Sequence, residues 1–132
     1  MRLPNSTTAR SSTQLWTGRV LSALAILFII FDLSIKFKHI APVTDSFARL
    51  GIPDHLVIAI ATLETICLLL YLIPRSAVFG AILLTGYLGG ATMCHVRVED
   101  PLFSHILFPT YIGTLLWVGL YLRDARLRAL FS

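Results

Sequence analysis

The amino-acid sequence predicts an all-α membrane protein, an antiparallel bundle of four transmembrane helices with a short interfacial helix between the first two. Of its 132 residues, 56% are hydrophobic and 14% are charged, whereas soluble domains carry about 25% charged residues. A soluble domain of this size could not cover so much apolar surface. The apolar residues fall into four runs, each near the ~20 residues that cross a ~30 Å hydrocarbon core. Because lipid offers no partner to backbone polar groups, these runs must be helices.

The first span is expected at about residues 15–35. The preceding residues 1–14 are polar and rich in Ser and Thr, which is typical of a disordered tail. The apolar run is too long for the core of a signal peptide, and no cleavage site followed by a soluble domain appears. We therefore keep this run as a membrane span.

The other three spans are expected at about residues 55–73, 76–96 and 104–122. Pro53 suits the start of the second span and Pro74 suits its end, because proline lacks the N–H that a helix interior needs. We therefore predict one transmembrane domain over residues 15–123, followed by a basic C-terminal tail at 124–132.

The segment between the first two spans, residues 37–53, should contain a short amphipathic helix at the membrane interface. Its apolar residues recur at helical spacing: Val43, Phe47 and Leu50. Either Pro42 or Thr44 could start this helix, and Gly51 could end it.

Basic residues predict the orientation of the bundle. With four spans, both tails and the middle loop share one side, which holds seven basic residues against four on the other side. Cytoplasmic segments of membrane proteins carry an excess of Arg and Lys, so the side with seven basic residues, which holds both termini, is expected in the cytoplasm. The net charge of +4 does not indicate nucleic-acid binding, because no basic stretch is interleaved with exposed aromatic residues.

Glu64 is the most unusual residue, because it falls near the middle of the second span. An ionisable side chain there costs about 2.5–3.5 kcal/mol. Its side chain is too short to reach the interface ~15 Å away. Glu64 must therefore either carry a proton or face a partner inside the bundle.

The predicted topology brings further polar residues to the outer part of the same bundle, at one membrane depth above Glu64. These residues are Asp32 and Lys36 in the first span, His95 and Arg97 in the third, and His105 in the fourth. We predict a polar cavity there, with all six as candidate ligand-binding residues. Two alternatives remain open. The outer residues could face the headgroups, and Glu64 could form a hydrogen bond between helices, for example near Thr62 or Tyr87.

Other chemistries have little support in the sequence. No spacing favours a metal site, no Gly-rich phosphate loop is present, and no Ser nucleophile lies in a recognisable elbow. Whether the chain is an enzyme stays open. Gly86 and Gly90 fit a motif for close helix approach, which packing within the chain or a homo-oligomer explains equally well.

Taken together, the order of landmarks resembles the DoxX-like family of small four-helix bacterial membrane proteins, over roughly residues 15–123. The landmarks are Phe47, Gly51 and Pro53 before the second span, Glu64 within it, Pro74 after it, a Gly-rich third span ending at His95, and the acidic turn Glu99, Asp100 and Pro101. The resemblance implies a bacterial inner-membrane location, with Glu64 and His95 as the polar positions of the family. The family is named after a small subunit associated with quinol oxidation. The segment around Asp32 departs from the family pattern.

The favoured hypothesis is a small redox-associated membrane component whose cavity binds a quinone-like, lipid-soluble ligand. Glu64 would exchange a proton, and His95 would donate a hydrogen bond to a ring carbonyl. Because the sequence has no haem- or flavin-binding signal, a membrane redox complex is the expected partner. The alternatives are a non-catalytic subunit or assembly partner, with Glu64 joining helices, and a small transporter. The absence of an internal repeat speaks against the transporter.

Overall fold

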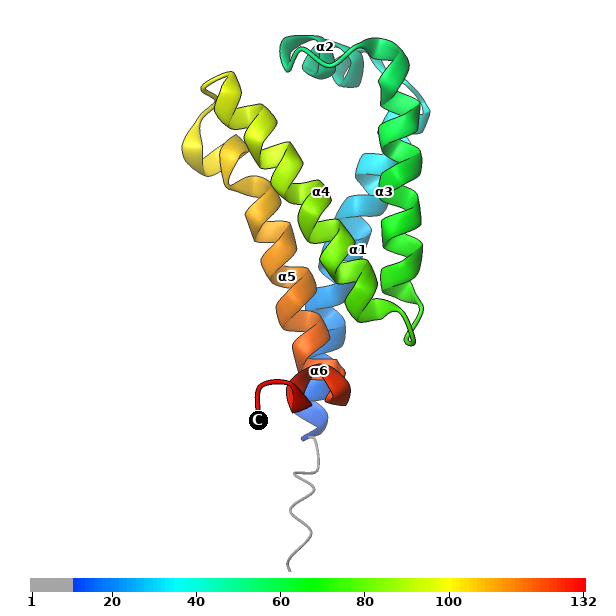
Figure 1. Cartoon of the computed structure of the whole chain (residues 1–132), viewed down its shortest axis with the longest axis vertical. Coiled ribbons are helices and arrows are strands. Elements are labelled where there is room, and N and C mark those ends of the chain that lie inside the picture. Colours follow the sequence, from blue (N-terminus) through cyan, green and yellow to red (C-terminus); the bar gives the residue numbers. More distant parts are fainter. Residues whose placement is uncertain (1–10) are drawn as a thin grey trace, which may run out of the picture.

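The computed structural model describes residues 11–132 and contains four long helices that lie antiparallel to their neighbours (Figure 1). They are α1 (Ser12–Phe37), α3 (Val57–Leu72), α4 (Ala77–Arg97) and α5 (Phe108–Arg123). Helix α1 packs against α3 and α5, and α4 packs against the same two helices from the opposite corner. Together with the short helical turns that precede α3 and α5, all four segments are long and apolar enough to cross a membrane. The predicted fold class is confirmed, and the chain is a multi-pass membrane protein.

Large apolar side chains cover the outside of this bundle. Leu27 and Phe31 on α1 are 63% and 61% exposed, whereas Ala25 and Ile29 on the opposite face are buried. The core is small and continues through Leu84 of α4. An apolar exterior around a packed apolar core is the arrangement expected of a bundle surrounded by lipid.

The first span begins earlier than predicted, because Ser11 caps α1. The Ser11 hydroxyl accepts a hydrogen bond from the Gln14 N–H at 3.2 Å, which satisfies one of the free donors at a helix start. Residues 12–14 of the predicted tail therefore belong to the helix. The rest of that predicted tail, residues 1–10, lies outside the described residues.

The fourth span also begins slightly earlier than predicted, with a π-helical turn at Leu102–Ile106 that precedes α5. Pro109 lies in the first turn of α5. Its missing N–H removes no helical hydrogen bond there. The second span likewise opens with a short 3₁₀ turn at Asp54–Leu56.

The predicted interfacial helix is present as α2 (Ala41–Arg49), which lies across one end of the bundle (Figure 1). Gly51, with φ of +72°, ends it. The Ile52 N–H bonds to the Phe47 carbonyl at 2.8 Å, and the Gly51 N–H bonds to the Ala48 carbonyl at 3.0 Å. These two bonds form a Schellman motif. We call the end beneath α2 the α2 end, and the opposite end, where α1 begins and α5 ends, the termini end.

Helix α4 ends in the same motif, but with Glu99 where glycine is preferred. Glu99 has φ of +56°, its N–H bonds to the Val96 carbonyl at 3.0 Å, and the Asp100 N–H bonds to the His95 carbonyl at 3.1 Å. A left-handed backbone strains any residue that carries a Cβ atom.

Glu99→Gly is therefore expected to raise the free energy of unfolding by about 1 kcal/mol, since glycine adopts this conformation without strain. The measurement is reversible unfolding by SDS in mixed micelles. Glu99→Ala is the matched control, because it removes the charge and keeps the Cβ atom. An equal gain in both variants would show that the charge, and not the backbone, is responsible.

The predicted basic tail contains a short helix, α6 (Ala125–Ala129), which follows α5 at the termini end. The Asp124 carboxylate caps it by accepting from the Arg126 and Leu127 N–H groups. Leu127 is buried, and the Arg126 guanidinium donates to the Pro74 carbonyl in the turn between α3 and α4. These contacts hold α6 against the bundle.

Candidate ligand site

A hydrogen-bonded cluster of ionisable side chains lies inside the bundle. Lys36 Nζ of α1 donates to Glu64 Oε2 of α3 at 2.7 Å and to the Tyr87 hydroxyl of α4 at 2.7 Å. Tyr87 in turn donates to Glu64 Oε2 at 3.0 Å. Asp32, one turn before Lys36, forms an ion pair with the same ammonium. We call Asp32, Lys36, Glu64 and Tyr87 the Lys36 cluster.

The direction of the Lys36 side chain explains why the cluster lies inside. Side chains of an α-helix point toward the helix N-terminus. Lys36 lies near the C-terminal end of α1, so its ammonium is directed back into the bundle. The residue is only 7% exposed and Glu64 only 3% exposed. The alternative in which Lys36 faces the headgroups is therefore wrong.

Charges within the Lys36 cluster are paired. One ammonium lies between two carboxylates, and the Tyr87 hydroxyl accepts from the ammonium while donating to Glu64. Buried charges are tolerated when they have such partners and are costly without them. Within residues 11–132, every buried side-chain nitrogen and oxygen has a hydrogen-bond partner. Glu64 thus has the partner inside the bundle that its position in the span requires.

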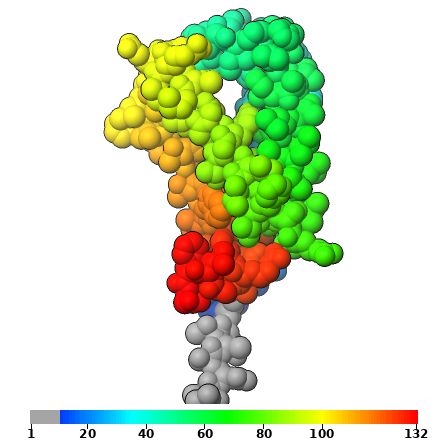
Figure 2. Space-filling view, in the orientation of Figure 1, coloured from blue at the N-terminus to red at the C-terminus, as the bar shows by residue number. Residues whose placement is uncertain are grey.

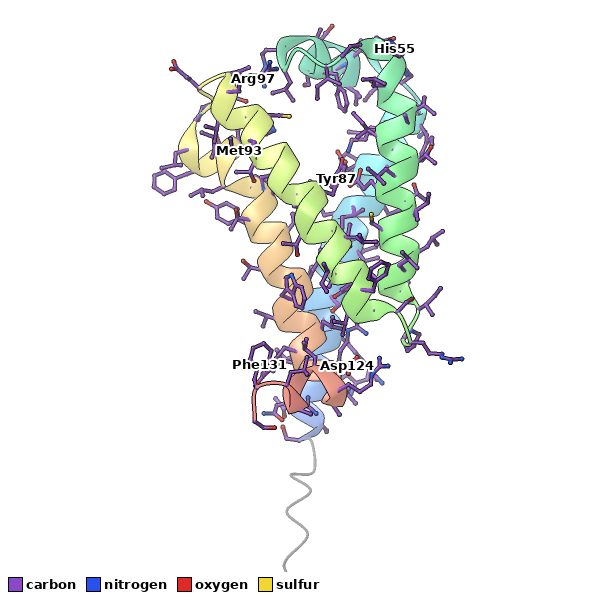
Figure 3. The ribbon with its side chains drawn as sticks, viewed as in Figure 1. His55, Tyr87, Met93, Arg97, Asp124 and Phe131 are labelled. Carbon is purple, nitrogen blue, oxygen red and sulfur yellow. The ribbon has the colours of Figure 1, made fainter. Side chains whose placement is uncertain are left out.

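The Lys36 cluster lies next to a hollow in the molecule. Figure 2 shows the surface hollowed beneath α2, between the parts of α3 and α4 that lie nearest to it. Tyr87 lies on the side of α4 that faces α3 and α1 (Figure 3). Asp32 is the more exposed of the two carboxylates, with 28% of its side chain accessible. Polar groups that are both held in place and reachable from a hollow are typical of ligand sites.

A second polar cluster fastens α2 to the turn that follows α4. Asp100 binds the Arg49 guanidinium with one oxygen and His95 Nδ1 with the other, the latter at 2.5 Å. The Arg97 guanidinium also donates to the Leu50 carbonyl at the end of α2. The His105 ring packs edge-on against His95, with ring centroids 5.8 Å apart. We call Arg49, His95 and Asp100 the Asp100 latch.

The hydrogen bonds of the latch change the acidity of Asp100. Those from Arg49 and then from His95 lower the pKa of its carboxyl from 3.8 to about 2. A group whose pKa is lower in the folded state stabilises that state when it is ionised. The contribution is therefore complete above pH 3.8 and is lost as the pH falls through about 2.

Asp100→Asn is expected to loosen α2, because it removes the charge that holds Arg49. Exposed ion pairs have modest effects, so the amide hydrogens of α2 should exchange about two to five times faster at pH 7. Asp45→Asn, an exposed change on α2 itself, is the control and should leave exchange unchanged. In the wild type, the ¹³C shift of the Asp100 carboxyl should titrate near pH 2. Equal exchange rates in the two variants would contradict the latch.

The six candidates from the sequence thus divide between two places. Asp32, Lys36 and Glu64 meet inside the bundle, while His95, Arg97 and His105 lie at the α2 end. The prediction of a single polar layer was too simple, because the Lys36 side chain runs inward from its backbone position.

Sequence reasoning named Tyr87 only as a neighbour of Glu64 and Asp100 only as part of the acidic turn, and it did not connect Asp100 with Arg49. A tyrosine in an otherwise Gly-rich apolar run was the available signal for Tyr87.

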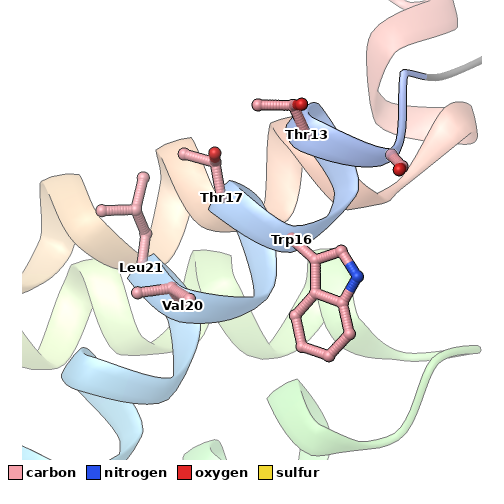
Figure 4. A pocket seen from close by; sticks show the side chains of 6 residues that line it. Thr13, Trp16, Thr17, Val20 and Leu21 are labelled. Atoms are coloured by element: carbon pink, nitrogen blue, oxygen red, sulfur yellow. The ribbon is translucent and has the colours of Figure 1, made fainter.

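Two other pockets lie away from the Lys36 cluster. One, of about 470 Å³, lies beside the start of α1 and is lined by Trp16, Thr17 and their neighbours on that helix (Figure 4). The other, of about 390 Å³, is an apolar groove between α4 and α5 at Gly89 and Trp117. Neither contains a residue of the cluster, and their described linings carry no ionisable group.

Comparison with known proteins places the chain in a family. The model of the DoxX-like family matches residues 20–119, which include most of all four long helices and the whole Lys36 cluster. No curated protein and no solved structure matches the chain. Since the match covers well over half of the chain, this protein belongs to the DoxX-like family of small membrane proteins.

Proposed function

We propose that this protein is a small redox-associated component of the bacterial inner membrane that binds a quinone-like, lipid-soluble ligand at the Lys36 cluster. In this proposal both termini face the cytoplasm, so the cluster lies toward the opposite leaflet. The observation that carries the proposal is the convergence of Lys36, Glu64 and Tyr87 from three helices beside a hollow in the membrane-spanning region.

The donors and acceptors of the cluster suit the polar atoms of a quinone. A quinone is flat and apolar except for its ring carbonyls, which need hydrogen-bond donors. In the structure the single O–H of Tyr87 donates to Glu64, so in this proposal it turns from Glu64 to a ring carbonyl when the ligand binds, while Lys36 keeps Glu64 in place. His95 is bound to Asp100 at the α2 end, so we assign the carbonyl contact to Tyr87 rather than to His95. Such a site combines an apolar approach from lipid with a few fixed polar groups.

The two carboxylates match the protons of the quinone–quinol reaction. When a partner enzyme takes two electrons from a bound quinol, two protons must leave the two hydroxyl groups. Glu64 accepts one proton, and Asp32, which is more exposed, accepts the other. The electrons go to a redox group of the partner, which we propose to be a membrane redox complex.

The test is mass spectrometry of the lipids that remain bound after purification in mild detergent. Wild type should carry a quinone enriched over the bulk membrane, and Glu64→Gln and Tyr87→Phe should lose it. Both variants should fold, because Lys36 keeps its ion pair with Asp32 in each. Thr62→Val is the control, since Thr62 is exposed on α3 and its hydroxyl bonds only to its own helix at Ile58. If wild type carries only bulk phospholipid, the quinone proposal fails.

A second candidate function is a non-catalytic subunit or assembly partner, including a homo-oligomer. Gly86, Gly89 and Gly90 of α4 favour it, because a Cβ atom on any of them would meet nothing within 4 Å. Packing within the described chain does not use these glycines, and small residues let another helix approach closely. Native mass spectrometry of wild type and Gly89→Ile tests this. Loss of a complex in the variant supports it, and a monomer in both excludes the homo-oligomer.

A further inference from the structure

The termini end carries a large excess of positive charge. Its described arginines are Arg19, Arg75, Arg123, Arg126 and Arg128. Among residues 11–132, the ion pair at this end is Arg126 with Asp124, at 3.1 Å. Within residues 11–132, four of these five arginines therefore have no ion-pair partner.

Arg123 differs from the others because its side chain turns into the bundle. Its Nε donates to the Ser22 hydroxyl of α1 at 3.1 Å, and its guanidinium carbon lies 5.2 Å from the centre of the Tyr71 ring of α3. Ser22 is 3% exposed and Tyr71 is fully buried. The Tyr71 hydroxyl is itself fixed by the Leu116 carbonyl at 2.8 Å. Three helices thus hold one guanidinium in a defined orientation.

The partners of this guanidinium are all neutral. The Ser22 hydroxyl accepts a hydrogen bond from the Nε of Arg123, and the face of the Tyr71 ring lies beside the guanidinium plane. No carboxylate of residues 11–132 lies within 4.0 Å of the guanidinium. Its two Nη groups make no hydrogen bond within the described chain. A half-buried cation at the edge of lipid is costly without a counter-ion. A guanidinium with its two-pronged edge free is the group that binds phosphate best.

We infer that Arg123 binds the phosphate of an anionic phospholipid from the leaflet at the termini end. The free edge of the guanidinium donates two hydrogen bonds to the phosphate oxygens, while Ser22 and Tyr71 keep it oriented. Arg19, whose guanidinium lies 5.4 Å from the centre of the exposed Trp16 ring, adds to the positive potential of this end. The excess charge of this end selects an anionic lipid over a zwitterionic one. This inference is independent of the quinone proposal.

The test is lipid retention measured by native mass spectrometry from bilayer discs of equal parts phosphatidylglycerol and phosphatidylcholine. Wild type should retain phosphatidylglycerol preferentially. Arg123→Gln should reduce the amount of retained phosphatidylglycerol about tenfold or more, because it removes a charge-assisted, two-pronged hydrogen bond to the phosphate. Arg75→Gln removes the same charge from the exposed turn at the same end and should reduce retention by no more than about fivefold, the non-specific contribution of one arginine near an anionic surface.

Three results would overturn the inference. One is the absence of a preference in wild type, and another is an equal loss in Arg123→Gln and Arg75→Gln, which would indicate overall charge alone. The third is full displacement of the lipid by inorganic phosphate, which would indicate a site for the free anion. If Arg123→Gln does not fold, Arg123→Lys replaces it, because lysine keeps the charge and lacks the two-pronged edge. Retention equal to wild type would then also overturn the inference.

Discussion

Lys36→Met is expected to lower the free energy of unfolding by about 3–5 kcal/mol, the usual cost of breaking a buried ion pair. The variant leaves the Glu64 carboxylate, 3% exposed, with Tyr87 as its remaining hydrogen-bond partner. It also leaves Asp32 without its ion-pair partner on the same helix. Glu64→Gln should cost much less, because Lys36 keeps Asp32 and the new amide can still accept a hydrogen bond.

Comparison with a double variant separates the charge from the packing. Lys36→Met combined with Glu64→Leu should recover most of the lost stability, because replacing a buried pair by apolar side chains is often nearly neutral. Lys38→Met, at an exposed neighbouring position, is the control and should unfold like wild type. Unfolding by SDS in mixed micelles measures the wild type and all four variants. If Lys36→Met matched the Lys38→Met control, the pairing of Lys36 with Glu64 would be wrong.

The second large effect is expected at Gly80, where α4 meets α3. A Cβ atom there would lie 2.2 Å from the Tyr71 backbone nitrogen and 2.6 Å from the Leu70 carbonyl carbon. Backbone atoms cannot rotate away as a side chain can, so the two helices must separate. Gly80→Ala should therefore cost about 3 kcal/mol or more, at the upper end of overpacking effects.

A glycine on the same helix provides the control for Gly80→Ala. A Cβ atom at Gly89 would meet no atom of the described chain within 4 Å, and alanine favours helices over glycine by about 1 kcal/mol. Gly89→Ala should therefore be neutral or slightly stabilising. The difference between the two melting temperatures in detergent is the readout. Equal melting temperatures would show that α3 and α4 are not in close contact at Gly80.

The sequence was sufficient for the number and order of the spans but not for their rotation about their own axes. Run length and Pro74 located the spans because lipid requires apolar helices of a minimum length. The rotation of each helix about its axis is harder to predict, because lipid and the bundle core are equally apolar and the helices show no clear polar face. Lys36 and Tyr87 meet across the bundle, between the opposite helices α1 and α4. No spacing in the sequence indicates that these two side chains lie within hydrogen-bond distance.

Contacts at the two ends were also beyond the sequence. The Asp100 latch joins a loop helix to a turn 51 residues away, and it depends on how far α4 tilts. The arrangement of Ser22, Tyr71 and Arg123 depends on the crossing of α1 and α5 at Gly18 and Gly119. Glu64 was located from sequence because one charged residue in a long apolar run stands out whatever the packing.

The most direct test of the Lys36 cluster uses the small number of lysines and glutamates in the chain. Lys36 and Lys38 are the lysines, and Glu64 and Glu99 the glutamates, so Lys38→Arg with Glu99→Gln leaves one of each. Solid-state NMR in lipid bilayers then measures the dipolar coupling between the labelled ¹⁵Nζ of Lys36 and the ¹³Cδ of Glu64. A strong coupling is expected from the 2.7 Å hydrogen bond. No measurable coupling in a folded protein would contradict the buried ion pair and, with it, the proposed ligand site.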